Sequence, residues 1–473
     1  MTHNLKAYPA YIDSGLPWVG DIPEHWETGR LDHLFSLRGE TPMDDDKRVT
    51  GYLDGRVTLR SNVVGQKIKG VVKEGGWQRV HPGDFAISGM NAHLGGMGVS
   101  DSLGKCSPIY LVLEPNYRTN ARFVALVVRH AAFSGALKAL VNTIRFNSAD
   151  FKRDDLKLIN VLQPPLSEQA AIVRYLDYAD RRIRRYIAAK RKLIALLNEQ
   201  KQAIIHQAVT RGLDPNVRLK PSGVEWLGDV PEHWGVSRLK FESAQIVDCL
   251  HATPEYLADG AFPAIRTADV KPGKLLIAGA RRVDATQYQL WTNRLQPEVG
   301  DILYTREGER YGIAAVVPAG VRLCISQRMM VFRIRPHRSS AYLMWQLNCP
   351  HVYAQAAADV IGATAPHVNV ERIKNYSILV PPHSEQQAIA AFVKRESEGI
   401  DVAIQALERE MNFVREYRTT LIGDVVTGKL DVREAAAKVL DEDDDDVPPA
   451  EPDDEFLESE QEAEDADLEL IEA

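Results

Sequence analysis

Two stretches of the chain place apolar residues at alternating spacings of four and three, which is typical of a helix that packs along one side. In the first stretch the apolar positions are Ile172, Leu176, Ala179, Ile183, Tyr186, Leu193, Leu197 and Ile204. In the second stretch they are Ile389, Val393, Ile400, Ala403, Leu407, Val414 and Leu421. The pattern predicts two helices of about 40 residues, roughly 60 Å long, that pair antiparallel.

Each predicted helix has a defined start. Proline pairs at 164–165 and 381–382 exclude helix before them, and Ser167 and Ser384 are predicted N-caps. Lys190 interrupts the apolar positions of the first helix, whereas the corresponding residue of the second is Leu407. The two helices are therefore expected to be similar but not interchangeable.

The residues before each helix contain short apolar runs between Gly and Pro turns, a pattern that predicts strands. The runs are 57–64, 83–89 and 108–115 before the first helix, and 261–270, 300–306 and 328–336 before the second. Both regions contain a Gly-Asp pair before a strand and a short apolar helix afterwards, near 123–129 and 341–347. The sequence therefore predicts a mixed α+β fold.

The chain is an internal duplication. SGLPWVGDIPEHW at 14–26 returns as SGVEWLGDVPEHW at 222–234, and 11 of 18 positions are identical between 14–31 and 222–239. VLQPPLSEQAAI at 161–172 likewise returns as ILVPPHSEQQAI at 378–389. The two repeats predict one unit of about 215 residues used twice. The regions between the repeats differ in sequence.

Charge divides the chain into a basic body and an acidic tail. The net charge is −8, but residues 441–473 contain 18 Asp and Glu and no Lys or Arg. Without them, 57 basic residues face 47 acidic ones, a net charge of +10 that favours a nucleic-acid partner. The tail is either a disordered segment that aids solubility or a competitor of DNA for the basic surface.

Other class signals are absent from the sequence. There is no secretory signal, the apolar run at 123–128 is too short to span a membrane, and the four cysteines form no C-x-x-C pair. We expect a soluble cytoplasmic protein without disulfides or a metal site.

No catalytic motif is complete. GVSDSLGKC at 98–106 has one residue too many for a phosphate loop and has Cys106 where a hydroxyl is needed. QPPL and VPPH lack the polar and aromatic neighbours of a base-methyltransferase site. His25 and His233 lack a nucleophile or metal-ligand partner, so they are interpreted as hydrogen-bonding caps of a turn. We predict a protein that is not an enzyme.

Both mixed regions offer polar side chains beside Gly-rich loops, which suits reading of DNA bases and close approach to phosphates. The candidates in the first half are Arg60, Asn62, Asn91, His93, Arg145 and Asn147. Those in the second half are Arg266, Thr267, Asp269, Arg306, Arg310, His367 and Asn369. Arg181 and Arg185, in the run RRIRR, belong either to a solvated helix face or to a surface that contacts the DNA backbone.

These motifs resemble a known family. The tag S-G-x-x-W-x-G-D-x-P-E-H-W-x-x-x-R-L and the segments PPLSEQAAI and PPHSEQQAI are similar to the recognition-domain entries and conserved spacer regions of specificity subunits of Type I restriction-modification systems. GDILYTREGERYGIAAVV and GDFAISGMNAHLGGMGVS resemble variants of one segment inside the family's recognition domains. The similarity covers roughly residues 10–431, and the acidic tail has no counterpart in it.

The resemblance implies a non-catalytic subunit in which two target-recognition domains are separated by a pair of long antiparallel coiled-coil helices with pseudo-twofold symmetry. It implies recognition domains at 1–163 and 215–380, spacer helices at 164–214 and 381–431, and a tail at 432–473. Each domain would read one half of a split, asymmetric DNA site. The positions implied for structure and assembly are Trp18, Trp26, Trp226, Trp234, Pro165, Glu168, Gln169, Pro382, Glu385 and Gln386.

The implied partners are double-stranded DNA, two modification subunits that methylate adenine with S-adenosylmethionine, and two restriction subunits that use ATP and magnesium. This chain would hold no cofactor itself. Three alternatives stay open at this point: a subunit of a related methyltransferase-based defence system, an enzyme with an unrecognised active site, and a coiled-coil adaptor that binds only proteins.

Overall fold

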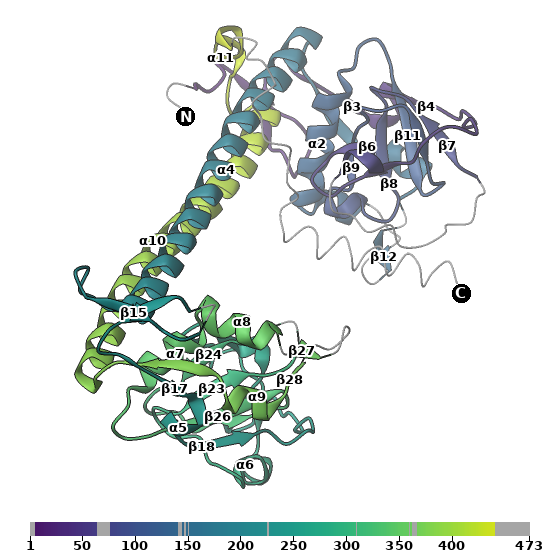
Figure 1. Ribbon diagram of the computed structural model, residues 1–473. Coiled ribbons are helices and arrows are strands. Elements are labelled where there is room, and N and C mark those ends of the chain that lie inside the picture. Colours follow the sequence, from purple (N-terminus) through teal and green to yellow (C-terminus); the bar gives the residue numbers. More distant parts are fainter. Residues whose placement is uncertain are drawn as a thin grey trace. The chain divides into compact units, whose positions relative to one another are not determined.

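The computed structural model describes residues 5–439, except 64–75, 141–143, 146–147, 150, 225–226, 309, 359 and 362–366. The chain divides into two compact units. The first comprises residues 1–191 and 409–473, and the second comprises residues 192–408. Both units combine helices with strands, so the predicted mixed fold is confirmed (Figure 1). Asn147, Trp226 and the acidic residues from 441 onward lie outside the described residues.

Each unit is built on a four-stranded antiparallel sheet with the same strand order. In the first unit the order is β4 (Phe35–Leu37), β11 (Tyr110–Pro115), β8 (Phe85–Ser88) and β9 (Met97–Val99). In the second it is β18 (Ser243–Asp248), β26 (Met329–Ile334), β23 (Ile302–Thr305) and β24 (Ala314–Val316). The apolar runs at 83–89, 108–115, 300–306 and 328–336 therefore form the sheet strands that the sequence predicts.

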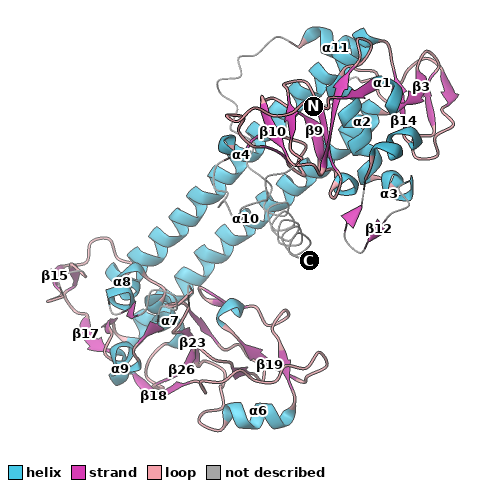
Figure 2. Ribbon diagram, turned by 90° about the vertical axis from the view of Figure 1, so that its right-hand side faces the viewer, coloured by secondary structure: helices cyan, strands magenta, loops and turns pink. Residues whose placement is uncertain are grey.

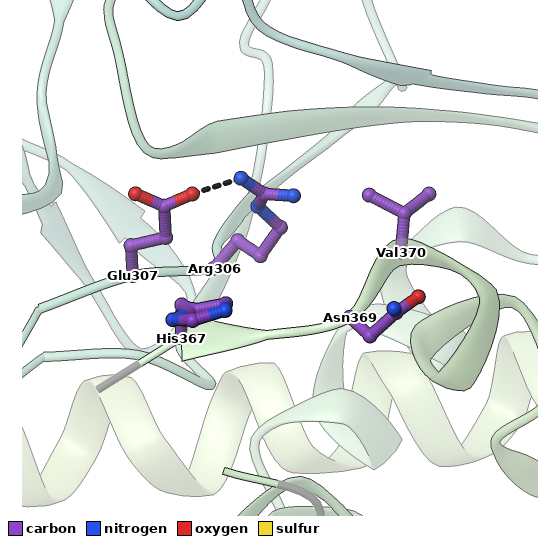
Figure 3. A pocket seen from close by; sticks show the side chains of 5 residues that line it. All are labelled: Arg306, Glu307, His367, Asn369 and Val370. Carbon is purple, nitrogen blue, oxygen red and sulfur yellow. Dashed lines mark hydrogen bonds and ion pairs between the residues drawn. The ribbon is translucent and has the colours of Figure 1, made fainter. Parts of the chain in front are cut away.

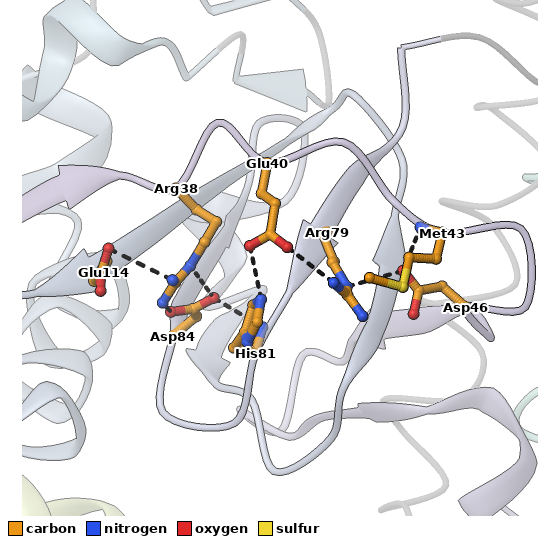
Figure 4. Close-up of polar contacts among 8 residues, drawn as sticks. All are labelled: Arg38, Glu40, Met43, Asp46, Arg79, His81, Asp84 and Glu114. Carbon is orange, nitrogen blue, oxygen red and sulfur yellow. Dashed lines mark hydrogen bonds and ion pairs between the residues drawn. The ribbon is translucent and has the colours of Figure 1, made fainter.

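The repeated Gly-Asp pair shapes the turn before the third strand of each sheet. Asp84 is 1% exposed, and its Oδ2 accepts a hydrogen bond from the amide of His81 at 2.8 Å and one from Arg38 Nε at 3.0 Å (Figure 4). Asp301 accepts a bond from the amide of Glu298 at 2.8 Å and pairs with Arg333. The conserved arrangement satisfies a buried carboxylate, which assigns the pair a structural role.

In each unit one helix covers the sheet, and a separate two-stranded ladder precedes the long helix. The first unit has α2 (Ala121–Phe133) and the ladder of β3 (Glu27–Arg30) with β14 (Asn160–Gln163). The second has α7 (Ser340–Leu347) and the ladder of β17 (Gly235–Arg238) with β29 (Ser377–Val380). Because β14 and β29 end just before the proline pairs, these ladders connect each repeated tag to the start of a long helix.

Shorter elements complete each unit. Those of the first unit are α1 (Leu31–Leu34), α3 (Ala136–Leu140), α11 (Arg433–Lys438), β1 (Tyr11–Asp13), β2 (Asp21–Pro23), β5 (Val49–Gly51), β6 (Val57–Leu59), β7 (Gln78–Val80), β10 (Gly104–Cys106), β12 (Ile144–Arg145) and β13 (Ser148–Ala149). Those of the second are α5 (Leu239–Glu242), α6 (Ala285–Thr292), α8 (Pro350–Ala358), α9 (Val370–Lys374), β15 (Leu219–Pro221), β16 (Asp229–Pro231), β19 (Phe262–Ile265), β20 (Val270–Lys271), β21 (Lys274–Leu275), β22 (Arg282–Val283), β25 (Cys324–Ile325), β27 (Val360–Ile361) and β28 (His367–Val368).

The long helices are α4 (Leu166–Arg211) and α10 (His383–Val426), which lie side by side (Figure 2). In the first unit Asp180 pairs with Arg418, and Lys190 Nζ lies 2.9 Å from Glu410. Because the partner number falls as the α4 number rises, the helices run antiparallel, as predicted. In the second unit Lys201 pairs with Asp401 at 2.7 Å. Lys190, which interrupts the apolar pattern of α4, is thus paired with the acidic Glu410 on α10.

Two details of the helix prediction are wrong. α4 and α10 begin at Leu166 and His383, one residue before Ser167 and Ser384, so these serines lie inside the helices and do not cap them. The contact pattern of α10 also differs, because Ile404 is buried whereas the adjacent Ala403, which we predicted, is not. The heptad register can be assigned one residue too early wherever two neighbouring positions, such as Ala403 and Ile404, are both apolar.

The acidic tail begins later than the sequence predicts. Residues 433–438 form α11, and Val432 and Ala436 are both fully buried in the core of the first unit. The predicted tail at 432–473 is therefore wrong for its first residues. Local composition missed this because a single helical turn with one buried alanine has no distinctive apolar pattern.

The described residues contain no helix that could cross a membrane. Within that part of the chain there is also no group of three or more His, Cys, Asp or Glu side chains placed to hold a metal ion. Cys106, Cys249, Cys324 and Cys349 are free and buried. Burial raises the pKa of Cys106, Cys324 and Cys349 to about 12, so these thiols stay protonated at neutral pH.

A buried histidine makes the second unit sensitive to acid. His351 on α8 is 6% exposed, and burial together with the neighbouring His206 lowers its pKa to about 4. In the unfolded chain the imidazole of His351 binds a proton near pH 6.5, whereas in the folded chain it does so only near pH 4. The unfolding free energy therefore has its full value above pH 6.5 and decreases as the pH falls toward 4. We expect a loss of about 3 kcal/mol over this window.

Urea unfolding of the full chain between pH 7 and pH 4 measures this dependence. His351→Leu is expected to flatten the pH profile of the unfolding free energy, whereas replacement of the exposed His337 by glutamine leaves it unchanged. An equally steep profile in His351→Leu would contradict the assignment.

Candidate nucleic-acid interface

In the first unit the repeated tag is fastened to the long helix through Glu168. This glutamate, in the first turn of α4, is 4% exposed and accepts hydrogen bonds from Trp26 Nε1 at 3.1 Å and Tyr8 Oη at 2.6 Å. His25 Nε2 lies 2.8 Å from its second oxygen. Burial and the Glu168 carboxylate together raise the pKa of Tyr8, so the phenol remains a donor. A carboxylate in the first turn also interacts favourably with the helix dipole.

The second unit repeats only part of this junction. Glu385 lies 2.8 Å from His233 Nε2, as Glu168 does from His25. Trp234 is 1% exposed, but its indole N–H has no hydrogen-bond partner among the described residues. The two histidines therefore connect the tag to the long helix, which differs from the turn-capping role that the sequence suggested.

The glutamines next to these glutamates make the same contacts in both units. Gln169 Oε1 accepts from the amide of Asn120 at 2.9 Å, and Gln386 Oε1 accepts from the amide of Ser339 at 2.9 Å. Their Nε2 atoms donate to the carbonyls of residues 164 and 381, each at 2.9 Å. Asn120 and Ser339 are the N-caps of α2 and α7. The glutamine thus joins the sheet-covering helix to the long helix, using two non-repeated partners that the sequence did not identify.

The indole contacts predict unequal effects of one substitution. Trp26→Phe removes a donor from a buried carboxylate and is expected to cost about 1–3 kcal/mol of unfolding free energy beyond its loss of volume. Trp234→Phe removes an N–H that has no partner in the described residues, so it is expected to cost less. Thermal unfolding of the two variants side by side tests this; equal losses would contradict the asymmetry.

Trp18 of the first tag, and Pro165 and Pro382 before the long helices, make fewer specific contacts. Trp18 is half-buried, with its ring 6.2 Å from that of His130. The carbonyls of Pro165 and Pro382 accept the amides of the glutamates at 2.8 and 2.9 Å, which starts each long helix.

Three candidate DNA-binding residues of the second unit line one hollow of about 450 Å³. They are Arg306, His367 and Asn369, and Glu307 and Val370 complete the lining. Figure 3 shows Arg306 and Glu307 facing His367 and Asn369 across the hollow. Arg306 pairs with Glu307 and lies 3.2 Å from Asp248, which holds the guanidinium in place.

The other candidates of the second unit form a neighbouring turn. Arg266 and Asp269 bond to each other at 2.9 Å, with Thr267 between them, and Asp269 is buried. Arg310 donates to the carbonyl of Val270 at 3.0 Å. Arg310 thus connects the segment after β23 to the turn that holds Arg266 and Asp269, and Arg306, in the same segment, lines the hollow. A second hollow, which shares Asn369 and adds Arg238, Arg372 and Asn375, continues the polar surface.

The candidates of the first unit lie on two turns. Arg60 Nε donates to Thr50 at 3.2 Å, and Asn62 Nδ2 donates to Thr58 at 3.0 Å. Asn91 and His93 lie on the turn after β8, where burial lowers the pKa of His93. The backbone of Arg145 in β12 pairs with β13, and no side-chain position is described for it.

The two arginines of α4 belong to a strongly basic part of the helix. Arg181 and Arg185 are half-buried, and both make polar contacts. Close by, Asp180 pairs with Arg184 at 2.8 Å. For the candidate Arg306, the sequence did not identify the acidic partners Asp248 and Glu307, because such a partner has no local sequence signal.

Comparison with known proteins gives one consistent result. Residues 254–406 match the family model described as Type I restriction modification DNA specificity domain. The putative type I restriction enzyme MjaX specificity subunit of Methanocaldococcus jannaschii is 23% identical over 437 residues, which cover 88% of this chain and 96% of the relative. The type I restriction enzyme EcoKI specificity subunit of Escherichia coli is also 23% identical over 437 residues, covering 87% of this chain and 90% of the relative.

A solved structure has a similar fold. Its title is "Structural basis underlying complex assembly and conformational transition of the type I R-M system", and it superimposes with a TM-score of 0.63 at 16% identity. The match covers 86% of this chain and 99% of the other.

Proposed function

We propose that this chain, which belongs to the family of DNA specificity subunits of Type I restriction-modification systems, reads a split DNA site and directs partner subunits to it. Each unit reads one half of an asymmetric site, and the paired helices set the number of unspecified base pairs between the halves. The chain itself performs no chemistry and acts in the cytoplasm as part of a phage-defence system.

One observation carries this proposal. Both units have the same strand order and the same Glu-His and Gln-amide junctions, while the turns with the candidate reading residues differ completely. A duplicated scaffold with different surface turns is suited to recognising two different sequences, because sequence is read by side chains and the scaffold only positions them.

In the second unit the proposed base-reading residues are Arg306, Arg310, Arg266, His367 and Asn369. An arginine held by acidic neighbours presents a fixed fork of donors, which suits the two acceptors of guanine in the major groove. Asp269 acts as a positioning residue for Arg266. In the first unit the proposed contacts come from the two turns that hold Arg60, Asn62, Asn91 and His93, together with Arg145 and Asn147.

The proposed partners are double-stranded DNA, two modification subunits and two restriction subunits. S-adenosylmethionine, ATP and magnesium act on those partners. The domain boundaries remain as the repeats suggest, with recognition domains at 1–163 and 215–380 and spacer helices at 164–214 and 381–431. The burial of Trp26 and Trp234 supports this division, because it separates the proposed assembly residues from the proposed reading residues.

Genome-wide mapping of N6-methyladenine tests the proposal. Cells would express this chain with the modification subunit of its own system, and control cells would lack this chain alone. We expect a methylated motif with two short blocks separated by a fixed unspecified gap, present only with the chain.

Three other results would overturn the proposal. A motif of one continuous block would exclude two readers, and absence of any chain-dependent motif with both subunits expressed would favour a protein-only adaptor. Methylation or cleavage by the purified chain alone would show that it is an enzyme.

A further inference from the structure

The basic charge of the first unit is concentrated in one part of α4. Residues 174–191, named here the basic segment, contain seven Arg and Lys and only two Asp. Both of those aspartates are also met by basic residues from other helices: Asp177 by Arg122 at 2.7 Å, and Asp180 by Arg418. The basic segment has a net charge of +5 (7 − 2). Glu410 of α10 pairs with Lys190 and offsets one of these charges, so the segment stays basic.

The opposite charge occurs in residues 441–473, named here the acidic segment. It contains 18 Asp and Glu and no Lys or Arg. A segment of this composition cannot bury an apolar core of its own, so its favourable interactions are with cations and water. The same chain thus contains an acidic sequence at 441–473 and a basic sequence on α4.

The described residues that precede the acidic segment are anchored close to α4. Val432 and Ala436 are buried in the core of the first unit, and the amide of Asp431 donates to the carbonyl of Lys6 at 2.8 Å. The guanidinium of Arg433 lies 5.0 Å from the ring of Tyr8, whose hydroxyl donates to Glu168 in the first turn of α4. Residues 431–438 are therefore anchored at the beginning of the helix that contains the basic segment.

The distance between the two segments is short compared with the chain available. Arg181 is 13 residues after Glu168, which is about 20 Å along a helix. A fully extended chain spans at most ~3.3–3.6 Å per residue, so about 6 residues are enough to cover that distance. The acidic segment is far longer than this, and attachment to the same unit gives it an effective concentration on the order of millimolar at the basic segment.

We propose that the acidic segment (441–473) binds the basic segment of α4 and that DNA must displace it. Carboxylates then occupy positions that DNA phosphates take in the bound complex, so the acidic segment lowers affinity for DNA in general and leaves the choice of bases unchanged. This inference rests on the proposed function, because it assumes that the first unit contacts DNA.

The first test measures DNA binding by the complex of this chain with its modification subunits. In one variant every Asp and Glu of 441–473 is replaced by Asn or Gln, which keeps the length and removes the charge. We expect about 10-fold tighter binding at low salt for both target and unrelated duplexes. The difference is expected to shrink as salt rises, because salt weakens the intramolecular contact as well.

A matched background locates the effect. In a chain carrying Arg181→Gln, Arg182→Gln and Arg185→Gln, neutralising the acidic segment is expected to change affinity by less than about twofold. Unchanged binding after neutralisation in the native background would overturn the proposal, and so would an equal gain in both backgrounds. Failure of the proposed function is distinguishable, because the methylation motif would then be absent in every variant.

The second test needs no DNA. All four native cysteines are buried, so a photo-crosslinker attached at Glu458→Cys reports on the acidic segment alone. We expect cross-links to residues 174–191, lost in 0.5 M salt and on addition of duplex DNA. Cross-links confined to other surfaces would overturn the proposal.

Discussion

Trp26→Ala is expected to destabilise the first unit by about 3–5 kcal/mol, a large fraction of the stability of an ordinary domain. The ring is 2% exposed and packs edge-on against Phe123 and Tyr8, so its loss opens a cavity. It also removes one of the donors of the buried Glu168. Soluble yield, urea unfolding and recovery of the complex with modification subunits measure the effect.

Alanine variants of the other tag tryptophans test whether burial of the ring determines the loss of stability. Trp234→Ala is expected to reduce yield and assembly in the same way, because its ring is equally buried. Trp18→Ala, at a half-buried position of the same tag, is expected to cost less than half as much. In none of these variants should the DNA sequence preference of the surviving complex change. Normal assembly with an altered sequence preference would refute the assignment of the tag to structure.

Arg306→Lys is expected to slow methylation of the target site by about 5- to 150-fold, the equivalent of losing one bidentate base contact of about 1–3 kcal/mol. Lysine keeps the positive charge beside Asp248 and Glu307, so the fold of the second unit is expected to persist. What it lacks is the planar fork of donors that arginine presents to the hollow. Initial methylation rates on a short duplex, together with the melting temperature of the complex, measure both effects.

Arg338→Lys is the control for this variant. Arg338 pairs with the buried Glu242 in the same unit and lines neither hollow. It is expected to leave the methylation rate within about twofold of the native value. An equal loss of rate in both variants would show that Arg306 acts through stability. No loss of rate in Arg306→Lys would remove Arg306 from the proposed reading residues.

The helices and sheet strands were predictable because their sequence signals are local and occur in both repeats. The spacing of apolar residues predicted α4 and α10 and their antiparallel pairing, and the runs beside Asp84 and Asp301 predicted the sheet strands. The resemblance implied a structural role for Glu168 and Glu385, which follow each proline pair in the same Ser-Glu-Gln sequence. Some of their partners, His25, Trp26 and His233, lie in the repeated tag. Tyr8, Asn120 and Ser339 belong to no repeated motif, so their contacts with the glutamate or glutamine were not predictable.

The candidate site was predictable in composition but not in arrangement. Residue types that read DNA could be selected from loops, and the structure places Arg306, His367 and Asn369 around one hollow. Nothing in the local sequence indicates that Asp269 is buried and bonded to Arg266. Such pairings depend on loops that close over many residues, so each side chain's partner is decided by tertiary structure and not by its neighbours in sequence.

The contact between Lys190 and Glu410 also bears on whether separate copies of the chain associate. By the repeat offset, Lys190 corresponds to Leu407 and Glu410 to Leu193. If α4 of one molecule paired with α4 of another in the same register, Lys190 would face Leu193, and an equivalent pairing of two α10 helices would set Glu410 against Leu407. Each such pairing would replace the ion pair between Lys190 and Glu410 with a contact between a charged and an apolar side chain. The pairing of α4 with α10 thus includes an interhelical ion pair that neither helix could form with a second copy of itself in this register.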